Sequence, residues 1–272
     1  MFMGLVGSEM CIRDRIMNFP AIDPIAFTIG PLAVRWYSLS YIIGILIGLI
    51  LINKFLITYK KNITKNDVYD LLNYLILGII IGGRLGYVFF YNLEFYFYNP
   101  FEILKIWNGG MSFHGAIIGI IISIAWFSFK NNKSFFDLTD IICLVSPIGI
   151  FFGRIANFIN GELYGKVTDH TFGIIFPRGG ELPRHPSQLY EAFFEGLILF
   201  IILNCLFFFT NLKSKSGIIS SLFLILYGIF RFCIETLREP DAHIGLLWNL
   251  LSMGQLLCCL LYTSDAADER LR

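Results

Sequence analysis

The chain has 272 residues, of which 56% are hydrophobic and only 15% are charged, against about 25% charged residues in ordinary soluble domains. So few charges cannot cover the surface of a soluble domain, and a net charge of +1 gives no reason to expect nucleic acid as a partner. Long apolar runs instead indicate a membrane protein, because a helix that crosses a bilayer needs about 20 mostly apolar residues. The six cysteines are not spaced as metal ligands or disulfides, so we expect no metal and no cofactor.

Seven apolar segments are long enough to be transmembrane helices, which predicts an all-α polytopic fold. They are residues 36–57, 68–91, 111–129, 136–153, 190–209, 218–236 and 244–261. The Gly- and Pro-rich segment 154–189 follows the fourth, and we expect it to form a small head outside the hydrocarbon, where irregular backbone can be hydrated. We assign residues 17–258 to one transmembrane domain and interpret residues 1–16 and 259–272 as non-native flanks, with Met17 as the native start.

Lysines gather in alternate loops, and this sets the expected orientation. The loops after the first, third and fifth segments carry Lys54, Lys60, Lys61, Lys65, Lys130, Lys133, Lys213 and Lys215. By the positive-inside rule these loops are cytoplasmic. The N-terminus and segment 154–189 then lie on the outer side of the membrane, and the C-terminus lies in the cytoplasm.

Four of the segments carry pairs of glycines that are four residues apart: Gly44/Gly48, Gly82/Gly86, Gly115/Gly119 and Gly149/Gly153. Such pairs let helix backbones approach closely in lipid, so we interpret them as packing positions. The sequence shows no internal repeat, which weighs against a secondary transporter.

Ionisable side chains inside the spans call for an explanation, because each costs about 2.5–3.5 kcal/mol at mid-bilayer. With the orientation given above they all fall at the outer ends of their segments: Tyr37, Arg84, His114, Arg154, Arg231, Glu235 and Arg238. Several arginines at one membrane surface predict an anionic ligand, and phosphate fits the guanidinium geometry best.

Helical spacing sharpens this prediction. One helix face carries a stripe at i, i+4, i+8 and i+11: Tyr227, Arg231, Glu235 and Arg238. Arg231 can therefore pair with Glu235, which would hold its charge in place. Arg154 and Asn157, three residues apart, also share a face.

Each of these residues also has a simpler interpretation. Arg84 could extend to the lipid headgroups, Arg231 and Glu235 could form a purely structural pair, and His114 could be a packing histidine. Ser112 beside His114 resembles a hydrolase pair, but no orienting carboxylate is near in the sequence. The remaining histidines, His170, His185 and His243, lie in expected outer loops.

Six motifs, in order along the chain, resemble those of bacterial phosphatidylglycerol–prolipoprotein diacylglyceryl transferases. The strongest is GRIANFINGELYG at Gly153–Gly165; the others are RWYSLSY at Arg35–Tyr41, GGRLGYVFFYN at Gly82–Asn92, GGMSFHG at Gly109–Gly115, RHPSQLYEAFFEG at Arg184–Gly196 and YGIFRFCIETLREPD at Tyr227–Asp241. The resemblance runs from about Met17 to Gln255. Ala116 and Ala156 stand where the family usually has glycine, and both changes are small.

The resemblance implies an enzyme of the bacterial inner membrane that catalyses the first step of lipoprotein maturation. Such an enzyme transfers the diacylglyceryl group from phosphatidylglycerol to a lipobox cysteine in the signal peptide of a preprolipoprotein. A thioether forms and glycerol phosphate leaves. The expected partners are therefore phosphatidylglycerol, that signal peptide and membrane lipids, with no nucleic acid.

This reaction suggests roles for the candidate residues. We expect His114 to be the general base for the thiol and Arg154 and Arg231 to hold the phosphate, with Tyr37 as a further catalytic residue. Glu162 and Glu235 could orient the arginines. The expected substrate-binding set is Arg84, Arg154, Asn157, Asn160, Glu162, Gly165, Tyr227, Glu235 and Arg238.

Two other classes compete with the transferase. A transporter or flippase for an anionic lipid could use the same arginines, but it predicts polar residues that continue to the cytoplasmic side. The inner halves of segments 36–57, 111–129 and 190–209 carry almost none. An intramembrane protease would need a Ser/His or paired-Asp arrangement within the spans, and the sequence offers none that is convincing.

Overall fold

The computed structural model describes residues 17–20, 22–30, 32–56, 62–106, 109–239, 246–247 and 251–252. The flanks interpreted as non-native, 1–16 and 259–272, lie outside these residues. The chain forms two compact units. Unit 1 comprises Met1–Gly48 and Cys143–Arg272, and unit 2 comprises Leu49–Ile142.

The all-α polytopic fold is confirmed. Within the described residues, six helices are long and apolar enough to cross a membrane: Trp36–Lys54, Lys65–Tyr91, Phe113–Asn131, Phe135–Ile159, Ser187–Phe209 and Ile218–Glu235. They match the first six predicted segments to within a few residues at most ends. Of the seventh, 244–261, only β5 (Leu246–Leu247) and β6 (Leu251–Ser252) are described, and they pair as short antiparallel strands. The rest of that segment lies outside the described residues.

One predicted boundary is wrong. Helix α6 (Phe135–Ile159) continues six residues past the predicted end at residue 153, so the head begins near residue 160 and not at Arg154. The prediction ended the span at the charge of Arg154. The helix continues because the residues after this arginine are largely apolar, and because carboxylates of another helix compensate the arginine.

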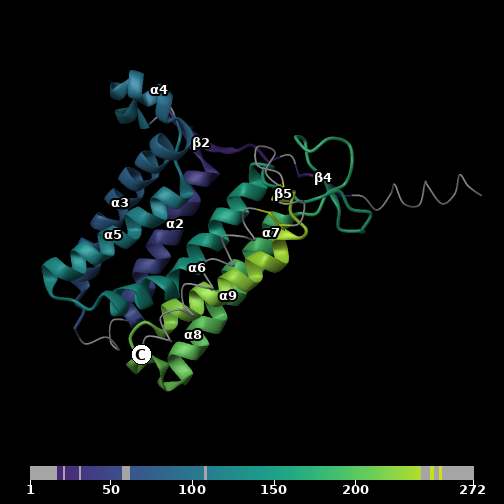
Figure 1. The fold of residues 1–272 in the computed structure, drawn as a ribbon. Helices are drawn as coiled ribbons and strands as arrows, with labels where there is room; N and C mark the ends of the chain where they lie inside the picture. Colours follow the sequence, from purple (N-terminus) through teal and green to yellow (C-terminus); the bar gives the residue numbers. More distant parts are fainter. Residues whose placement is uncertain are drawn as a thin grey trace, which may run out of the picture. The chain divides into compact units, whose positions relative to one another are not determined.

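Unit 1 contains most of the first and fourth spans, the whole of the fifth and sixth spans, and the head (Figure 1). Strand β1 (Met17–Asn18) pairs in parallel with β4 (Ile174–Ile175) of the head, and the hairpin of β2 (Ile25–Ile29) and β3 (Leu32–Arg35) leads into α2 (Trp36–Leu51). The fifth span is built of α7 (Ser187–Glu191), the π-helical stretch η4 (Ala192–Ile198) and α8 (Leu199–Phe209). It packs along α9 (Ile218–Glu235), with η5 (Asn211–Ser214) in the turn between them.

In unit 1, a glycine contact brings the backbones of α2 and α6 together. A Cβ atom added to Gly44 would lie 3.1 Å from the Cα of Gly149, and one added to Gly48 would make ordinary contact with Val145 at 3.5 Å. The packing role is therefore confirmed for Gly44, whereas the space beside Gly48 would accept a methyl group. An added Cβ at Gly153 would meet nothing within 4 Å, so that glycine is not needed for packing in the described part of the chain.

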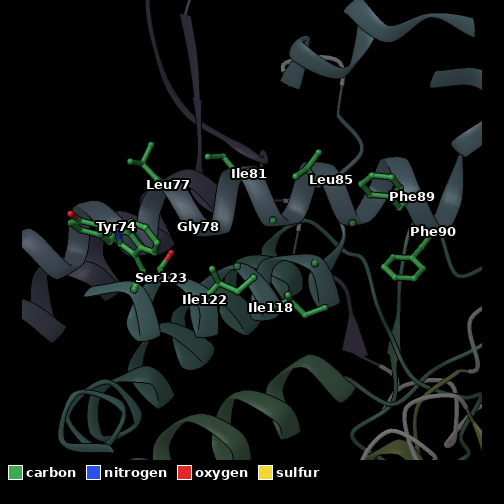
Figure 2. A pocket seen from close by; sticks show the side chains of 15 residues that line it. Tyr74, Leu77, Gly78, Ile81, Leu85, Phe89, Phe90, Ile118, Ile122 and Ser123 are labelled. Atoms are coloured by element: carbon green, nitrogen blue, oxygen red, sulfur yellow. The ribbon is translucent and has the colours of Figure 1, made fainter. Parts of the chain in front are cut away.

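Unit 2 is dominated by the antiparallel packing of α3 (Lys65–Tyr91) on α5 (Phe113–Asn131). The backbones meet along the glycines of both helices, where added Cβ atoms would lie 2.0 Å (Gly119) and 2.4 Å (Gly82) from carbonyl oxygens of the opposite helix. Because the seam has almost no side chains, the larger residues stand on either side of an apolar groove of about 430 Å³. Figure 2 shows Leu77, Ile81, Leu85 and Phe89 along one wall, and Ile118 and Ile122 along the other.

Short elements complete unit 2. The π-helical turn η1 (Ile52–Leu56) follows α2, and α4 (Leu93–Tyr98) with the 3₁₀ turn η2 (Pro100–Leu104) follows α3. At the other end of α3, Thr64 and Asp67 form a capping box. Lys133, in the turn after α5, donates to Asp67 at 2.8 Å. The turn between α5 and α6 is thereby tied to the first turn of α3.

The glycine seam predicts a stability effect. Gly119→Ala should place a methyl group against the carbonyl of Gly78 and lower the free energy of unfolding by about 1–3 kcal/mol, the usual cost of overpacking. The matched control is Gly149→Ala, because its added Cβ meets nothing within 4 Å. SDS titration of the purified protein measures both values, and equal losses in the two variants would contradict the seam.

Candidate active site

Two glutamates on the fifth span form the centre of a charged cluster. Glu191 ends α7 and Glu195 lies one turn later in the π-helical stretch η4; both side chains are 0% exposed. A π-helical turn is rare and is often found at functional sites. Gly196 lets this stretch pack directly on α6, because a Cβ there would lie 2.7 Å from the Cβ of Phe151. The carboxylates are thereby brought within reach of Arg154, one turn further along α6.

Arginines from two helices converge on Glu191. Its Oε2 lies 2.9 Å from Nη1 of Arg154, and its Oε1 accepts a hydrogen bond from Nη1 of Arg231 at 2.8 Å. Nη1 of Arg238 lies 3.7 Å from the same Oε1. Glu195 is further away, with its oxygens 3.6 Å from Arg154 and 3.7 Å from Arg231. One carboxylate thus holds three guanidinium groups together, and the second stands behind two of them.

The predicted stripe is confirmed for the three residues that α9 contains, Tyr227, Arg231 and Glu235, whereas Arg238 follows the end of the helix and still reaches Glu191. Arg231 pairs with Glu235 at 2.6 Å, as the i, i+4 spacing indicated. Tyr227 lies in the electrostatic field of Glu195, Arg154 and Arg231, with its ring stacked on Phe223. The side chains of Arg154 and Arg231 keep 18% and 12% of their surface exposed, so the guanidinium groups line the edge of the cluster while the glutamates are enclosed.

The turn after α6 is organised by Glu162. The side-chain amides of Asn157 and Asn160 both donate to its Oε1, at 2.9 and 3.2 Å. The prediction that Glu162 orients an arginine is therefore corrected: its partners in the structure are these two asparagines. The reason is local, because Gly161 at φ +63° turns the chain back so that the carboxylate lies over the end of its own helix.

The same turn is fixed to the helix that carries the glutamates. Gln188 donates to the carbonyl of Glu162 at 2.6 Å, and Ser187 donates to that of Leu163 at 2.9 Å. Both Gln188 and Ser187 are fully buried. The start of α7, and with it Glu191, is thus positioned by the turn that follows Arg154.

Gly165 has a packing role next to Arg238. Its N–H donates to the carbonyl of His185 at 2.8 Å, and the residue forms an antiparallel bridge with Arg238. An added Cβ would lie 2.6 Å from the carbonyl oxygen of Leu237. Only glycine therefore lets the head approach the end of α9 this closely.

Tyr37 lies at the start of α2 with its side chain 36% exposed. Its hydroxyl accepts a hydrogen bond from Tyr41 at 3.0 Å, and the two rings meet edge to face at 5.1 Å. Arg154 acts electrostatically on Tyr41, so this pair of tyrosines is near the charged cluster.

Arg84 of unit 2 does not extend toward the headgroups, so that interpretation is wrong. It is 4% exposed, and its guanidinium donates to five main-chain carbonyls: those of Glu102, Ile103, Lys105, Gly109 and Gly110. A guanidinium has five N–H donors. Each of them therefore has an acceptor, and Arg84 anchors the segment between α4 and α5 to α3.

His114 lies in the first turn of α5, also in unit 2. The turn is capped by Ser112, whose Oγ accepts from the N–H of Gly115 at 3.3 Å and whose own N–H donates to the carbonyl of Gly83 at 2.8 Å. The imidazole is exposed and meets the ring of Phe113 edge to face. Ser112 thus serves as a helix cap in the structure, and its resemblance to a hydrolase nucleophile ends there.

Two of the remaining histidines lie together in the head. The rings of His170 and His185 are 5.9 Å apart, and Nδ1 of His185 lies 3.4 Å from the hydroxyl of Tyr190. Burial lowers the pKa of His185 below its ordinary value of 6.5, and the nearby His170 lowers it further. His243 lies outside the described residues.

Sequence reasoning missed Glu191 and Glu195. The signal was present, because two acidic residues at i, i+4 inside an apolar span are costly in lipid and mark a functional site by default. They were overlooked because the predicted span began at residue 190, which placed Glu191 at its edge.

Unit 1 therefore contains six buried or nearly buried ionisable groups, five of them on three membrane-spanning helices and the sixth, Arg238, just past the end of α9. Such a site suits recognition of an anion within a membrane, so the fold and the cluster define a polytopic membrane protein that acts on an anionic ligand.

Comparison with known proteins specifies the class. The profile of the prolipoprotein diacylglyceryl transferase family matches residues 24–267. The phosphatidylglycerol–prolipoprotein diacylglyceryl transferase of Rickettsia felis is 55% identical over 241 residues, which cover 89% of this chain and 93% of that protein. The proteins of the same name from Rickettsia typhi and Rickettsia bellii are 56% and 55% identical over the same length. This chain belongs to the prolipoprotein diacylglyceryl transferase family, a family of bacterial multi-pass membrane enzymes, and the predicted transferase function is confirmed.

Glu191 should be essential for the stability of the cluster. Glu191→Leu would leave three arginines without their shared carboxylate and should lower the free energy of unfolding by about 3–5 kcal/mol. The control is Glu102→Leu, which breaks a largely exposed pair with Lys105 and should cost less than about 1 kcal/mol. Equal losses in SDS titrations would show that Glu191 is not the central partner.

The head should lose stability in acid. Because the folded head disfavours the charged form of His185, the unfolded head binds more protons, and stability falls as pH drops through 6.5 toward the lowered pKa. Limited proteolysis within residues 160–186 should therefore be faster at about pH 5 than at about pH 8. His185→Gln should remove the difference and His170→Gln should reduce it. An unchanged difference in His185→Gln would assign the effect to another group.

Proposed function

We propose that Arg154 and Arg231 together bind the phosphate of phosphatidylglycerol and stabilise the charge that grows as glycerol phosphate leaves. The observation that carries this proposal is that both guanidinium groups reach the same buried carboxylate, Glu191, at 2.9 and 2.8 Å. Two guanidinium groups held so close can donate to one phosphate, whose oxygens match their planar fork. Preorganised donors act more strongly in such a water-poor site than in water.

The acceptor is the thiol of a lipobox cysteine in the signal peptide of a preprolipoprotein. A free thiol has a pKa of about 8.5, so a base that takes its proton favours the reactive thiolate. His114 is our candidate for this base, because its imidazole is exposed at the start of α5. The sulfur forms a bond to the carbon of the diacylglyceryl group that carries the phosphate. The bond from that carbon to the phosphate oxygen breaks, and the electron pair leaves with glycerol phosphate.

The other candidate residues act on the headgroup or on the arginines. Since Tyr37 accepts a hydrogen bond from Tyr41, its own hydroxyl proton remains available for the lipid headgroup. Asn157 could bind the headgroup through its carbonyl oxygen, because its amide N–H₂ already donates to Glu162. Glu235 orients Arg231. The remaining predicted residues of unit 1, Asn160, Glu162, Gly165, Tyr227 and Arg238, position the loops and charges around these groups, and Arg84 fixes the segment between α4 and α5 in unit 2.

The orientation in the membrane is part of the proposal. We place the head and the arginine cluster at the outer face of the bacterial cytoplasmic membrane, with the N-terminus periplasmic and the C-terminus cytoplasmic. The support is the lysine distribution, since Lys65 begins α3, Lys130 and Lys133 flank the turn after α5, and Lys213 lies before α9. Both substrates then enter from the bilayer, because the lipid and the signal peptide are apolar over most of their length.

Transfer from phosphatidylglycerol with labelled acyl chains to a lipobox peptide tests these roles. Arg154→Ala and Arg231→Ala should each lower the rate by about 10²–10³-fold, the usual effect of removing one charge-stabilising contact. His114→Gln should also lower it. The control is Arg178→Ala, an exposed arginine of the head that should retain the wild-type rate. Near-normal transfer by folded Arg154→Ala would refute the phosphate clamp, and near-normal transfer by His114→Gln would require another base.

A further inference from the structure

The charged cluster is electrically balanced before any lipid arrives. Three guanidinium groups (Arg154, Arg231 and Arg238) face three carboxylates (Glu191, Glu195 and Glu235). Phosphatidylglycerol brings a further negative charge, so in the proposed function a net charge of minus one would be created in a water-poor site. That is costly unless the charge is compensated. One of the carboxylates must therefore move away or lose its charge.

The two fully buried glutamates are held very differently. Glu191 contacts Arg154 and Arg231 at 2.9 and 2.8 Å, and one of these contacts is a hydrogen bond. Glu195 is equally buried, but neither of its oxygens has a hydrogen-bond partner among the described residues. It lies 3.6 Å from Arg154 and 3.7 Å from Arg231, too far for hydrogen bonds. Glu195 thus compensates the charges of Arg154 and Arg231 without accepting a hydrogen bond from their N–H groups.

We infer that Glu195 is an exchangeable counter-ion: when the lipid phosphate binds to Arg154 and Arg231, the Glu195 carboxylate takes up one proton and becomes neutral. The inference rests on the proposed phosphate site. The phosphate adds one negative charge and the proton adds one positive charge, so the net charge of the cluster is unchanged. The proton comes from water, and no bond other than the new O–H is formed.

The surroundings of Glu195 favour it over the other two carboxylates for this exchange. The ionisable groups that face it are Arg154 from α6, Glu191 from α7, Tyr227 and Arg231 from α9, and Arg238 just past the end of α9. Once phosphate engages the two nearest arginines, their positive charges are shared with it, and Glu195 then faces two negative charges, those of Glu191 and of the phosphate, besides Arg238. Like charges that share a buried site cannot all remain ionised, and the one without hydrogen bonds is the least costly to protonate.

Proton uptake on lipid binding is the direct test. A short-chain phosphatidylglycerol is titrated into the detergent-solubilised protein by calorimetry, in buffers that differ in ionisation enthalpy. The wild type should take up about one proton per lipid, and its dissociation constant should rise about tenfold per pH unit across the range where uptake occurs. Glu195→Gln should bind the lipid with no uptake and no pH dependence. Glu102→Gln, the same change in a glutamate outside the cluster, should retain the uptake.

Each contrary result refutes either the proton exchange or the proposed phosphate site. A wild type that binds without proton uptake, or uptake that persists in Glu195→Gln, refutes the exchange. If Arg154→Ala binds the lipid as the wild type does, the phosphate site of the proposed function is wrong. If it does not, and the wild type takes up no proton, that site stands and the exchange alone fails.

A second measurement covers the case in which Glu195→Gln does not fold. Infrared difference spectra of the wild type should show a carboxylic-acid C=O band that appears when the short-chain lipid binds. Glu195→Asp should shift that band. A wild-type spectrum without the band refutes the exchange.

Discussion

Compensation of charge inside a membrane is the constraint on which the rest of unit 1 depends. An arginine in a span is expensive, and Arg154 and Arg231 lie together here, with Arg238 just past the end of α9, only because Glu191 offers both its oxygens to them and Glu195 lies behind. The glutamates in turn reach α6 only because Gly196 lets the backbones approach, and their helix starts where it does because Gln188 and Ser187 bind the turn after α6. The motifs around Arg154, Glu191 and Arg231 are separated in the sequence, but in the structure each depends on the others for its position.

The chain buries guanidinium groups in two ways, and the difference distinguishes arginines that can bind a ligand from one that only fixes a loop. Arg84 gives all five donors to main-chain carbonyls, so it has none left for a ligand and fixes a loop. Arg154 and Arg231 are compensated by carboxylates, and each keeps part of its side-chain surface accessible. A neutral carbonyl dipole cannot be exchanged for a phosphate without losing the loop, whereas a carboxylate and a phosphate are equivalent partners. The arrangement of partners therefore tells more about function than burial alone.

Periodicity in the sequence predicted the helices and their charged face, whereas features that depend on contacts across helices were harder to predict. Six spans were predicted from apolar runs, and helical spacing indicated the stripe of Tyr227, Arg231, Glu235 and Arg238. The end of α6 was misplaced because a charge was taken as a boundary, although its compensation comes from a helix more than thirty residues later. Two of the five carbonyls around Arg84 belong to the 3₁₀ turn η2 and three to the irregular backbone after it, whose course no residue pattern reveals. Glu162 was assigned to arginines because its local turn geometry, set by Gly161, could not be inferred from composition.

The head helps to position the residues of the site. Gly165 joins the strand-like backbone of His185 on one side and bridges Arg238 on the other, and Lys166 donates to the carbonyl of Leu237 at 2.9 Å. His185 is only two residues before Ser187, where the glutamate-bearing span begins. A change that loosens the head must therefore loosen both ends of the cluster, at the start of α7 and at the end of α9. It follows that the chemistry of the arginines is sensitive to residues that never touch the lipid, and that a loss of activity from a head substitution is interpretable only alongside the state of the Arg154–Glu191–Arg231 contacts.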